Sequence, residues 1–446
     1  MLSPDVVYPA VLTWLEVVGG PSHRAARQAV AHLVAALMLA QSLHSADLQR
    51  VLSGPRTVPA RQRFKRLARV LDRPWLTPAR LTPLLVRAAL CLVPPEPARG
   101  PTAGVTHLAL DSVRCGRWEV FVVGVVWHGR ILPVGWAVLP YPWPKGRFGP
   151  TVQGLVQAVA ACWPPERPAH LVADRAFPSR ALFATLQTAG WGWTLRVAAP
   201  RGVIVDGGAT TVGGLLRTAV PGRWRTWGGA AYGTGPKAIR GTLVVGQGLP
   251  VVAPHQANPS SQRVRARRHA ARQAYLRRKH RADRGHEGTA TATDGWMALF
   301  TTHATRHAAL ASYRRRWAIE GSFRDAQGGW DRRHGWDLEP VLARQATAQR
   351  ATALVGLWAL GTLLQSRLGD RVAAATAPAA IQTARAGWTT TGRLSVWARG
   401  QFALREPDPA VQAWVLATLA DARLSTTQPA RPPLPLRPPV ALRPAA

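Results

Sequence analysis

The chain has 446 residues, of which 47% are hydrophobic, and its 57 lysines and arginines face 22 aspartates and glutamates. So much apolar material can bury a sizeable core, which excludes a wholly disordered chain. The formal net charge of +35 comes almost entirely from arginine and points to a polyanionic partner, with nucleic acid first, because guanidinium groups bind phosphates in a bidentate way. A GC-rich coding sequence would explain part of the arginine content, but not the excess of positive charge.

The three cysteines lie far apart and form no Cys-x2-Cys pair, so zinc or redox work is not expected. They are Cys91, Cys115 and Cys162. The N-terminus lacks the basic segment that opens a signal peptide, and no uncharged apolar run reaches the roughly 18 to 20 residues that span a bilayer. We therefore expect neither a signal peptide nor a membrane anchor, and a reducing cytoplasm as the location.

Residues 1–95 have the hydrophobic pattern of a small helical domain. Apolar side chains recur at helical spacing over Ser22–Leu43, and shorter helices are predicted over Ala46–Leu52 and Pro59–Leu71. The predicted inner face of the third helix carries Phe64, Leu67 and Leu71.

The same third helix presents Arg61, Lys65 and Arg69 on another face. A helix, a short turn and a basic helix resemble a helix-turn-helix that binds DNA. An ordinary solvated helix face would carry the same charges, and that alternative stays open. We expect residues 1–95 to be a helical DNA-binding domain.

After the proline-rich linker Pro94–Pro101, the pattern changes from helical to extended. Strands are predicted over Val105–Asp111, Trp118–Trp127 and Ile131–Leu139, and then a helix, a strand, a second helix and a further strand follow up to Val197. This is the order of a ribonuclease-H-like mixed sheet. The predicted fold class is therefore α/β, with the first part of the sheet domain over residues 102–199.

Residues 200–302 are rich in Gly, Val and Thr and are predicted to form a β-rich insertion in the sheet domain. Inside it, Arg263–Arg284 holds ten basic residues that are opposed only by Asp283. This density favours phosphate binding over an ordinary basic loop, which is the alternative. The residues at its centre that we expect to bind DNA are Arg277, Arg278 and Lys279.

Helical patterns return after the insertion. Residues 303–370 are predicted to complete the sheet domain and to carry a helix with a glutamate, and residues 371–428 are predicted to form C-terminal helices. Prolines are too frequent over residues 429–446 for helix or sheet, so a disordered tail is expected there.

Acidic residues are scarce, which makes their positions informative. Asp111 and Asp174 each follow a buried apolar strand, so neighbouring strands would bring both carboxylates to one edge of the sheet. Divalent metal ions that act on phosphodiesters prefer such oxygen ligands. Taken singly, an aspartate after a strand is more often a turn former or a helix cap.

The third carboxylate, Glu320, lies in a segment predicted as one helix over residues 313–327. At about 100° per residue, one face of such a helix gathers a phenol, two guanidinium groups, the carboxylate and an amide. These side chains belong to Tyr313, Arg316, Glu320, Arg324 and Gln327. That face suits a metal ion and the phosphates beside it, whereas the alternative is an exposed helix with an ordinary Arg316/Glu320 pair.

At these residues the sequence resembles the DDE transposases of bacterial insertion sequences. The family signature Tyr-x2-Arg-x3-Glu-x6-Lys is similar to the spacing of Tyr313, Arg316 and Glu320, with Gln327 at the last place. The stretch from Asp174 to Phe177 resembles the family's element around the second acid, and Asp111-Ser112 fits the first. The resemblance covers essentially residues 100–370.

The resemblance implies a two-metal site in which Asp111, Asp174 and Glu320 hold Mg2+, or Mn2+ as a substitute. It also implies that Tyr313 and Arg316 grip a phosphate near the cleaved end.

Two tryptophans also match the family. The resemblance implies that Trp296 and Trp317 hold a flipped base, although a core role is the alternative for both. Because Gln327 replaces the family's lysine, either Arg324 supplies the missing charge or this copy of the transposase has weakened activity.

The implied function is metal-dependent cleavage of DNA at insertion-sequence ends and strand transfer into target DNA. The implied partners are double-stranded DNA, both element ends and target, and a second copy of the chain in a homodimer on DNA, with no membrane involved. The expected location is the bacterial cytoplasm, in association with the nucleoid. Two alternatives stay open: a ribonuclease-H-like nuclease without strand transfer, and a transposase-derived DNA-binding protein.

Overall fold

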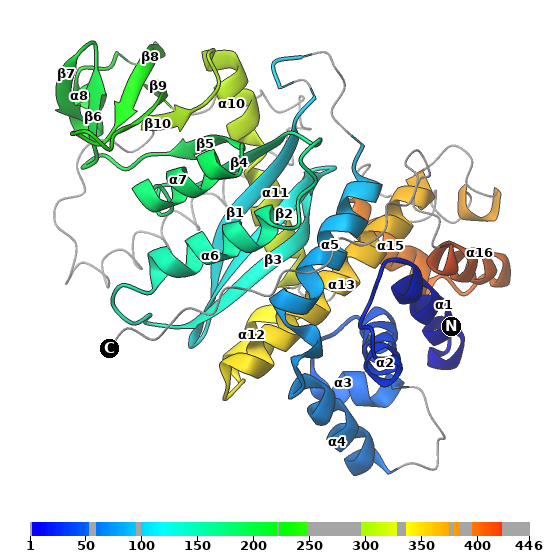
Figure 1. Ribbon diagram of the computed structural model, residues 1–446. Coiled ribbons are helices and arrows are strands. Elements are labelled where there is room, and N and C mark those ends of the chain that lie inside the picture. Colours follow the sequence, from blue (N-terminus) through cyan, green and yellow to red (C-terminus); the bar gives the residue numbers. More distant parts are fainter. Residues whose placement is uncertain are drawn as a thin grey trace, which may run out of the picture.

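The computed structural model describes residues 2–52, 59–94, 100–102, 104–220, 223–247, 296–327, 336–373, 379–382 and 395–421 (Figure 1). The described parts form one long mixed sheet with helices packed against it and a helical region built from both ends of the chain. The predicted disordered tail and the basic segment with Arg277, Arg278 and Lys279 lie outside the described residues.

The N-terminal part is helical, as predicted. Its helices are α1 (Pro4–Val17), α2 (Arg24–Ala40), α3 (Ser45–Val51), α4 (Ala60–Leu71), the 3-10 turn η1 (Pro74–Leu76) and α5 (Pro78–Leu92). The α1 and α5 helices were not predicted individually, and each contains an internal proline that weakens the sequence signal for a helix.

One side chain of α4 that was predicted to be buried is exposed. Phe64 is 47% exposed, whereas Leu67, Val70 and Leu71 are buried. The buried arc of α4 is centred near Leu67, and Phe64 lies one turn earlier at its margin. The placement of Phe64 on the inner face was therefore wrong.

The first five strands have the order and directions of a ribonuclease-H-like sheet. They are β1 (Thr106–Cys115), β2 (Trp118–Trp127), β3 (Arg130–Pro140), β4 (Ala169–Ala173) and β5 (Gly192–Arg196). Their order is β3-β2-β1-β4-β5, with β1, β4 and β5 parallel to one another and β2 antiparallel to both β1 and β3. The α/β fold class is confirmed.

The insertion does not form a sheet of its own but lengthens this one. Its elements are β6 (Gly202–Val205), β7 (Gly208–Thr211), α8 (Val212–Arg217), β8 (Arg225–Tyr232), β9 (Ile239–Gln247) and β10 (Trp296–Thr301). Strand β10 pairs antiparallel with β5 on one side and with β9 on the other, so the order continues as β5-β10-β9-β8-β6-β7. In Figure 1 these strands extend the sheet away from the helical region.

The remaining helices cover the sheet and complete the helical region. They are α6 (Phe148–Ala160), α7 (Arg180–Thr188), α10 (Arg306–Arg314), α11 (Trp317–Ala326), α12 (Leu338–Ala343), α13 (Ala348–Ala373), α15 (Val396–Arg405) and α16 (Pro409–Ala420). Buried along most of its length, α13 packs against β3 and α15.

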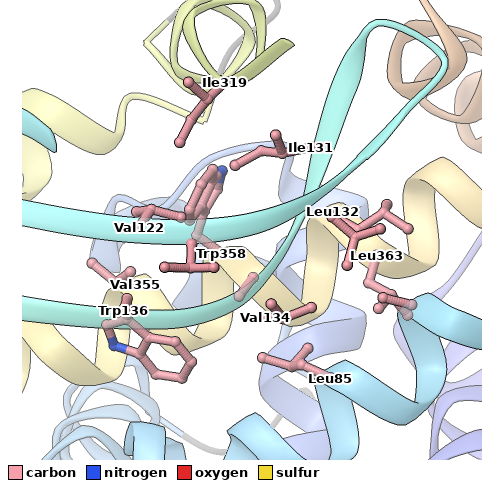
Figure 2. Close-up of a cluster of buried hydrophobic side chains, with 14 of the residues drawn as sticks. Leu85, Val122, Ile131, Leu132, Val134, Trp136, Ile319, Val355, Trp358 and Leu363 are labelled. Atoms are coloured by element: carbon pink, nitrogen blue, oxygen red, sulfur yellow. The ribbon is translucent and has the colours of Figure 1, made fainter. Parts of the chain in front are cut away.

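The core between β3 and α13 also supports α11. Figure 2 shows Trp358 of α13 gathered with Val122, Ile131 and Ile319, all of which are buried. The rings of Trp358 and Phe323 of α11 stack with centroids 6.4 Å apart. Burial of these large side chains fixes the position of α11 relative to the sheet, because a well-packed interior leaves no room for sliding.

Among the described residues, no single helix is long and apolar enough to span a membrane. The α2 and α3 helices reach the required length and composition only when taken together across a 104° bend.

Three histidines cluster near the starts of β1 and β4. The Nε2 atoms of His107 and His303 lie 2.9 and 2.7 Å from the hydroxyl of Ser312, and Nε2 of His170 lies 2.8 Å from the hydroxyl of Thr194. The rings of His170 and His303 stack with centroids 4.3 Å apart. Burial lowers the pKa of His303 to about 4 and that of His170 well below its ordinary value, and the neighbouring imidazoles lower both further.

This cluster predicts a loss of stability in acid. Between pH 6.5 and about 4 the unfolded chain binds protons at these histidines while the folded chain does not, so the free energy of unfolding should fall as the pH falls through this window. Urea denaturation at several pH values measures it. The substitution His303→Gln should flatten the dependence and His307→Gln, at an exposed position, should not. Equal pH dependence in wild type and His303→Gln would contradict the assignment.

Candidate active site

The pairing of two parallel strands brings two aspartates together. In the register of β1 with β4, Leu110 lies opposite Ala173, so Asp111 and Asp174 are the next residues of adjacent strands. The prediction that β1 ends at Asp111 was wrong, because β1 continues to Cys115. Only its pairing with β4 ends there, and the remaining residues pair with β2 alone.

Glu320, on α11, is linked to Asp111 by one arginine that contacts both carboxylates. The Nη1 atom of Arg316 lies 3.2 Å from Oδ2 of Asp111, and its Nη2 atom lies 2.7 Å from Oε1 of Glu320. The Arg316 side chain is only 8% exposed. A single buried guanidinium group thus joins carboxylates that are far apart in the sequence.

The segment carrying this arginine is not one continuous helix, and that prediction was wrong. It divides into α10 and α11 at Arg315 and Arg316, where the backbone amides bond to the carbonyls of Ser312 and Tyr313 at 3.0 Å in both cases. These are bonds to the third residue back, which tighten the turn. Tyr313 therefore belongs to a different helix from Glu320.

Asp174 has two partners of its own. The hydroxyl of Tyr313, a side chain that is almost fully buried, donates to Oδ1 of Asp174 at 3.3 Å. The guanidinium of Arg196 lies 3.5 Å from the same oxygen. Arg196 was not predicted, although the register of β4 with β5 could have found it: Ala173 lies opposite Leu195, so Asp174 comes beside Arg196.

The charges at the site shift three pKa values. Burial, and then the nearby carboxylates of Asp174 and Glu320, raise the pKa of Asp111 to about 6, against the opposing effects of the Ser112 amide and Arg316. Burial and the charge of Asp174 raise the pKa of Tyr313 to about 12, which keeps its hydroxyl a donor. Burial alone would lower the pKa of Arg316, but the neighbouring Tyr313 and the three carboxylates outweigh it and raise that pKa.

The donor set has the chemistry of a divalent cation site. The carboxylates of Asp111 and Glu320 contact one buried guanidinium group, Asp174 lies within its electrostatic reach, and hard oxygen donors of this kind are those that Mg2+ prefers. The cation between Asp111 and Glu320 in this structure is the guanidinium group of Arg316. In the part of the chain that the structure describes, no three acidic, histidine or cysteine side chains stand close enough to hold an ion as they are placed.

A cleft of about 850 Å³ opens beside Glu320. One wall consists of residues of α10 and α11, and the rest of the lining comes from the turn between β2 and β3 around His128, from residues 92–94 at the end of α5 and from Asp370 of α13. Trp317 is 55% exposed in this cleft, with the guanidinium of Arg316 5.4 Å from its ring centroid. Arg324 is exposed on the same wall, whereas Gln327 is half-buried at the end of α11.

Trp296 and the basic face of α4 occupy two other places. Trp296 is half-buried at the start of β10, three residues before Leu299, the partner of Arg196. It therefore lies beyond the sheet edge that carries the carboxylates.

The side chains of Arg61, Lys65 and Arg69 are exposed on α4, which packs against α3 and α13. Figure 1 shows α4 well away from β4 and α11, so these residues form a separate surface.

Comparison with known proteins adds one match. Residues 150–338 match the family model described as transposase DDE domain. The matched segment contains Asp174, Tyr313, Arg316 and Glu320, and Asp111 precedes it. No curated protein matches the chain.

The helix that carries Glu320 is fastened to the start of β3. The Nε atom of Arg130 lies 2.6 Å from Oδ2 of Asp325, and the amide of Ile131 donates to the hydroxyl of Ser322 at 2.8 Å. A Cβ atom at Gly321 would lie only 2.9 Å from Nη1 of Arg130, so a larger residue there would push the guanidinium group aside. Asp325 is buried, and burial raises its pKa despite this partner.

The substitution Arg130→Met should lower the free energy of unfolding by about 3 kcal/mol, because it leaves the Asp325 carboxylate buried without its main partner. The double variant with Asp325→Asn should cost less than the sum of the two single changes. Arg324→Met, at an exposed position of the same helix, should change stability by less than about 0.5 kcal/mol. Urea denaturation of the four variants measures these values, and additive effects would show that the pair is not coupled.

Proposed function

We propose that this chain, whose residues 150–338 match the family model described as transposase DDE domain, is a transposase that cuts DNA at insertion-sequence ends and joins the freed ends to target DNA. The observation that carries the proposal is the gathering of Asp111 and Glu320 around one buried cation, with Asp174 on the adjacent strand. The transposase DDE family acts with divalent metal ions. Bound by these carboxylates, Mg2+ or Mn2+ would activate the attacking water or 3′-hydroxyl and stabilise the leaving oxygen.

The protein's own groups hold and orient this site. Tyr313 and Arg196 orient Asp174 through their contacts with its Oδ1 atom. Arg316 is the proposed ligand of a phosphate next to the cleaved bond, because its planar group matches phosphate oxygens in pairs.

The cleft beside Glu320 is the proposed path of the DNA end. Trp317 offers an exposed ring for stacking on a base, and Trp296 lies past the same sheet edge. Arg324 is the proposed substitute for the family's lysine, because it is exposed on the cleft wall while Gln327 is half-buried. We propose that Arg277, Arg278 and Lys279 add phosphate contacts.

The DNA partner also accounts for the net charge of +35, which phosphates would screen. We propose that two copies of the chain bring the two element ends together, as the family resemblance implies.

Loss of one carboxylate should stop the chemistry and leave binding. The variant Glu320→Gln should cut a labelled duplex carrying the element's own end at least about 1,000-fold more slowly in Mg2+ or Mn2+, because ligand loss removes several kcal/mol of transition-state stabilisation. Glu166→Gln, at an exposed loop position, is the matched control and should cut normally.

The products and a gel-shift measurement complete this test. Joined product shows strand transfer, whereas a cut without joining indicates a nuclease. Retained binding with no cut by the wild type under either metal would show a DNA-binding protein without catalysis.

The basic face of α4 gives an independent prediction about binding. The variants Arg61→Gln, Lys65→Gln and Arg69→Gln should each weaken duplex binding and reduce the slope of log affinity against log salt concentration by about 1, because each removes one phosphate contact. Arg217→Gln, an exposed position on α8 at the far end of the molecule in Figure 1, is the control. An unchanged salt slope in all three α4 variants would mean that this face is only a solvated surface.

A further inference from the structure

The buried cation at the site belongs to the protein itself. Arg316 contacts Oδ2 of Asp111 at 3.2 Å and Oε1 of Glu320 at 2.7 Å, and it lies within electrostatic reach of Asp174. The planar fork of an arginine offers separate N–H donors to two carboxylates at once, and arginine cannot lose its charge at any physiological pH. The guanidinium charge therefore offsets part of the repulsion between the carboxylates in the absence of an added ion.

This arrangement competes with a metal ion. A divalent ion bound by the same carboxylates would face a fixed positive charge at close range and little water to screen it. It would also have to take the oxygens of Asp111 and Glu320 that Arg316 now holds.

The side chain of Arg316 lies close to a second place that it could occupy, the cleft beside Glu320. It lies at the junction of α10 and α11, beside the exposed ring of Trp317 that opens into the cleft. Its buried Nε atom has no hydrogen-bond partner within the described part of the chain. An unmet buried donor is costly, and a phosphate oxygen in the cleft would satisfy it.

We propose that Arg316 is an internal counter-ion that occupies the metal position until DNA binds, and that a DNA phosphate then draws it away and frees the carboxylates. This inference rests on the proposed function, since it takes Asp111, Asp174 and Glu320 as the metal ligands. It means that DNA and metal bind cooperatively, and by linkage each must raise the affinity for the other by the same factor. The chain would thereby load its metal on DNA and stay inert away from it.

The test measures Mn2+ affinity, by the paramagnetic resonance of free Mn2+, with and without a duplex that lacks element ends. Without DNA, Arg316→Met should bind Mn2+ at least about tenfold more tightly than the wild type, because the competing charge is gone. Adding the duplex should tighten Mn2+ binding by the wild type and leave Arg316→Met nearly unchanged. The variant Asp111→Asn supplies the background of Mn2+ bound to DNA or elsewhere on the protein.

The matched control is Arg314→Met, which removes the same charge from an exposed neighbouring position. Equal tightening in both variants would show a general charge effect and overturn the proposal, as would unchanged or weaker Mn2+ binding by Arg316→Met. If Arg316→Met does not fold, Arg316→Gln replaces it. Glutamine also removes the competing charge while keeping a polar side chain, so tighter Mn2+ binding than in the wild type is again expected and equal affinity would overturn the proposal.

Failure of the proposed function would look different. If Asp111→Asn lowers Mn2+ binding neither in the wild type nor in Arg316→Met, with or without the duplex, the carboxylates are not metal ligands and the catalytic assignment fails. If Asp111→Asn loses Mn2+ binding while Arg316→Met behaves like the wild type, only the counter-ion role fails.

Discussion

The parallel pairing of β1 with β4 is the interaction on which the site depends. It places Asp111 and Asp174 side by side, and the next parallel strand adds Arg196 at the same edge. Because backbone hydrogen bonds set this register, the positions of these side chains follow from the sheet and not from loops. The ten-stranded sheet of the described chain continues from β5 to β10, so the insertion joins the sheet at the strand that carries Arg196.

The second requirement is compensation of charge. Carboxylates brought together in a partly buried place are costly to ionise: burial first, and then the nearby charges of Asp174 and Glu320, raise the pKa of Asp111 to about 6. The α11 helix brings Glu320 and also the cation that offsets it. Apolar packing on Trp358 and the Arg130/Asp325 ion pair hold this helix over the strand ends. The same helix therefore carries the carboxylate of the site and the buried contacts whose stabilisation offsets the electrostatic cost of that site.

Much of this could be predicted from the sequence, because burial leaves a clear periodic signal. The buried strands before Asp111 and Asp174 and the spacing around Glu320 identified the fold class and the three acids as candidates. The break between α10 and α11 was not predictable, since the helical period continues through Arg315 and Arg316 without a glycine or proline. Arg196 was missed because its role comes from strand register, which a single strand does not reveal. Phe64 was misplaced because helical periodicity gives a direction but not the width of the buried arc.

The most direct measurement is a crystal structure of the chain with Mn2+ and a duplex of the element end, with the metal located by anomalous scattering. The account predicts an anomalous peak bounded by Asp111, Asp174 and Glu320, with the guanidinium of Arg316 turned to a DNA phosphate. Bound DNA with no peak at these carboxylates, or with Arg316 still bridging Asp111 and Glu320 beside a metal held elsewhere, would contradict it.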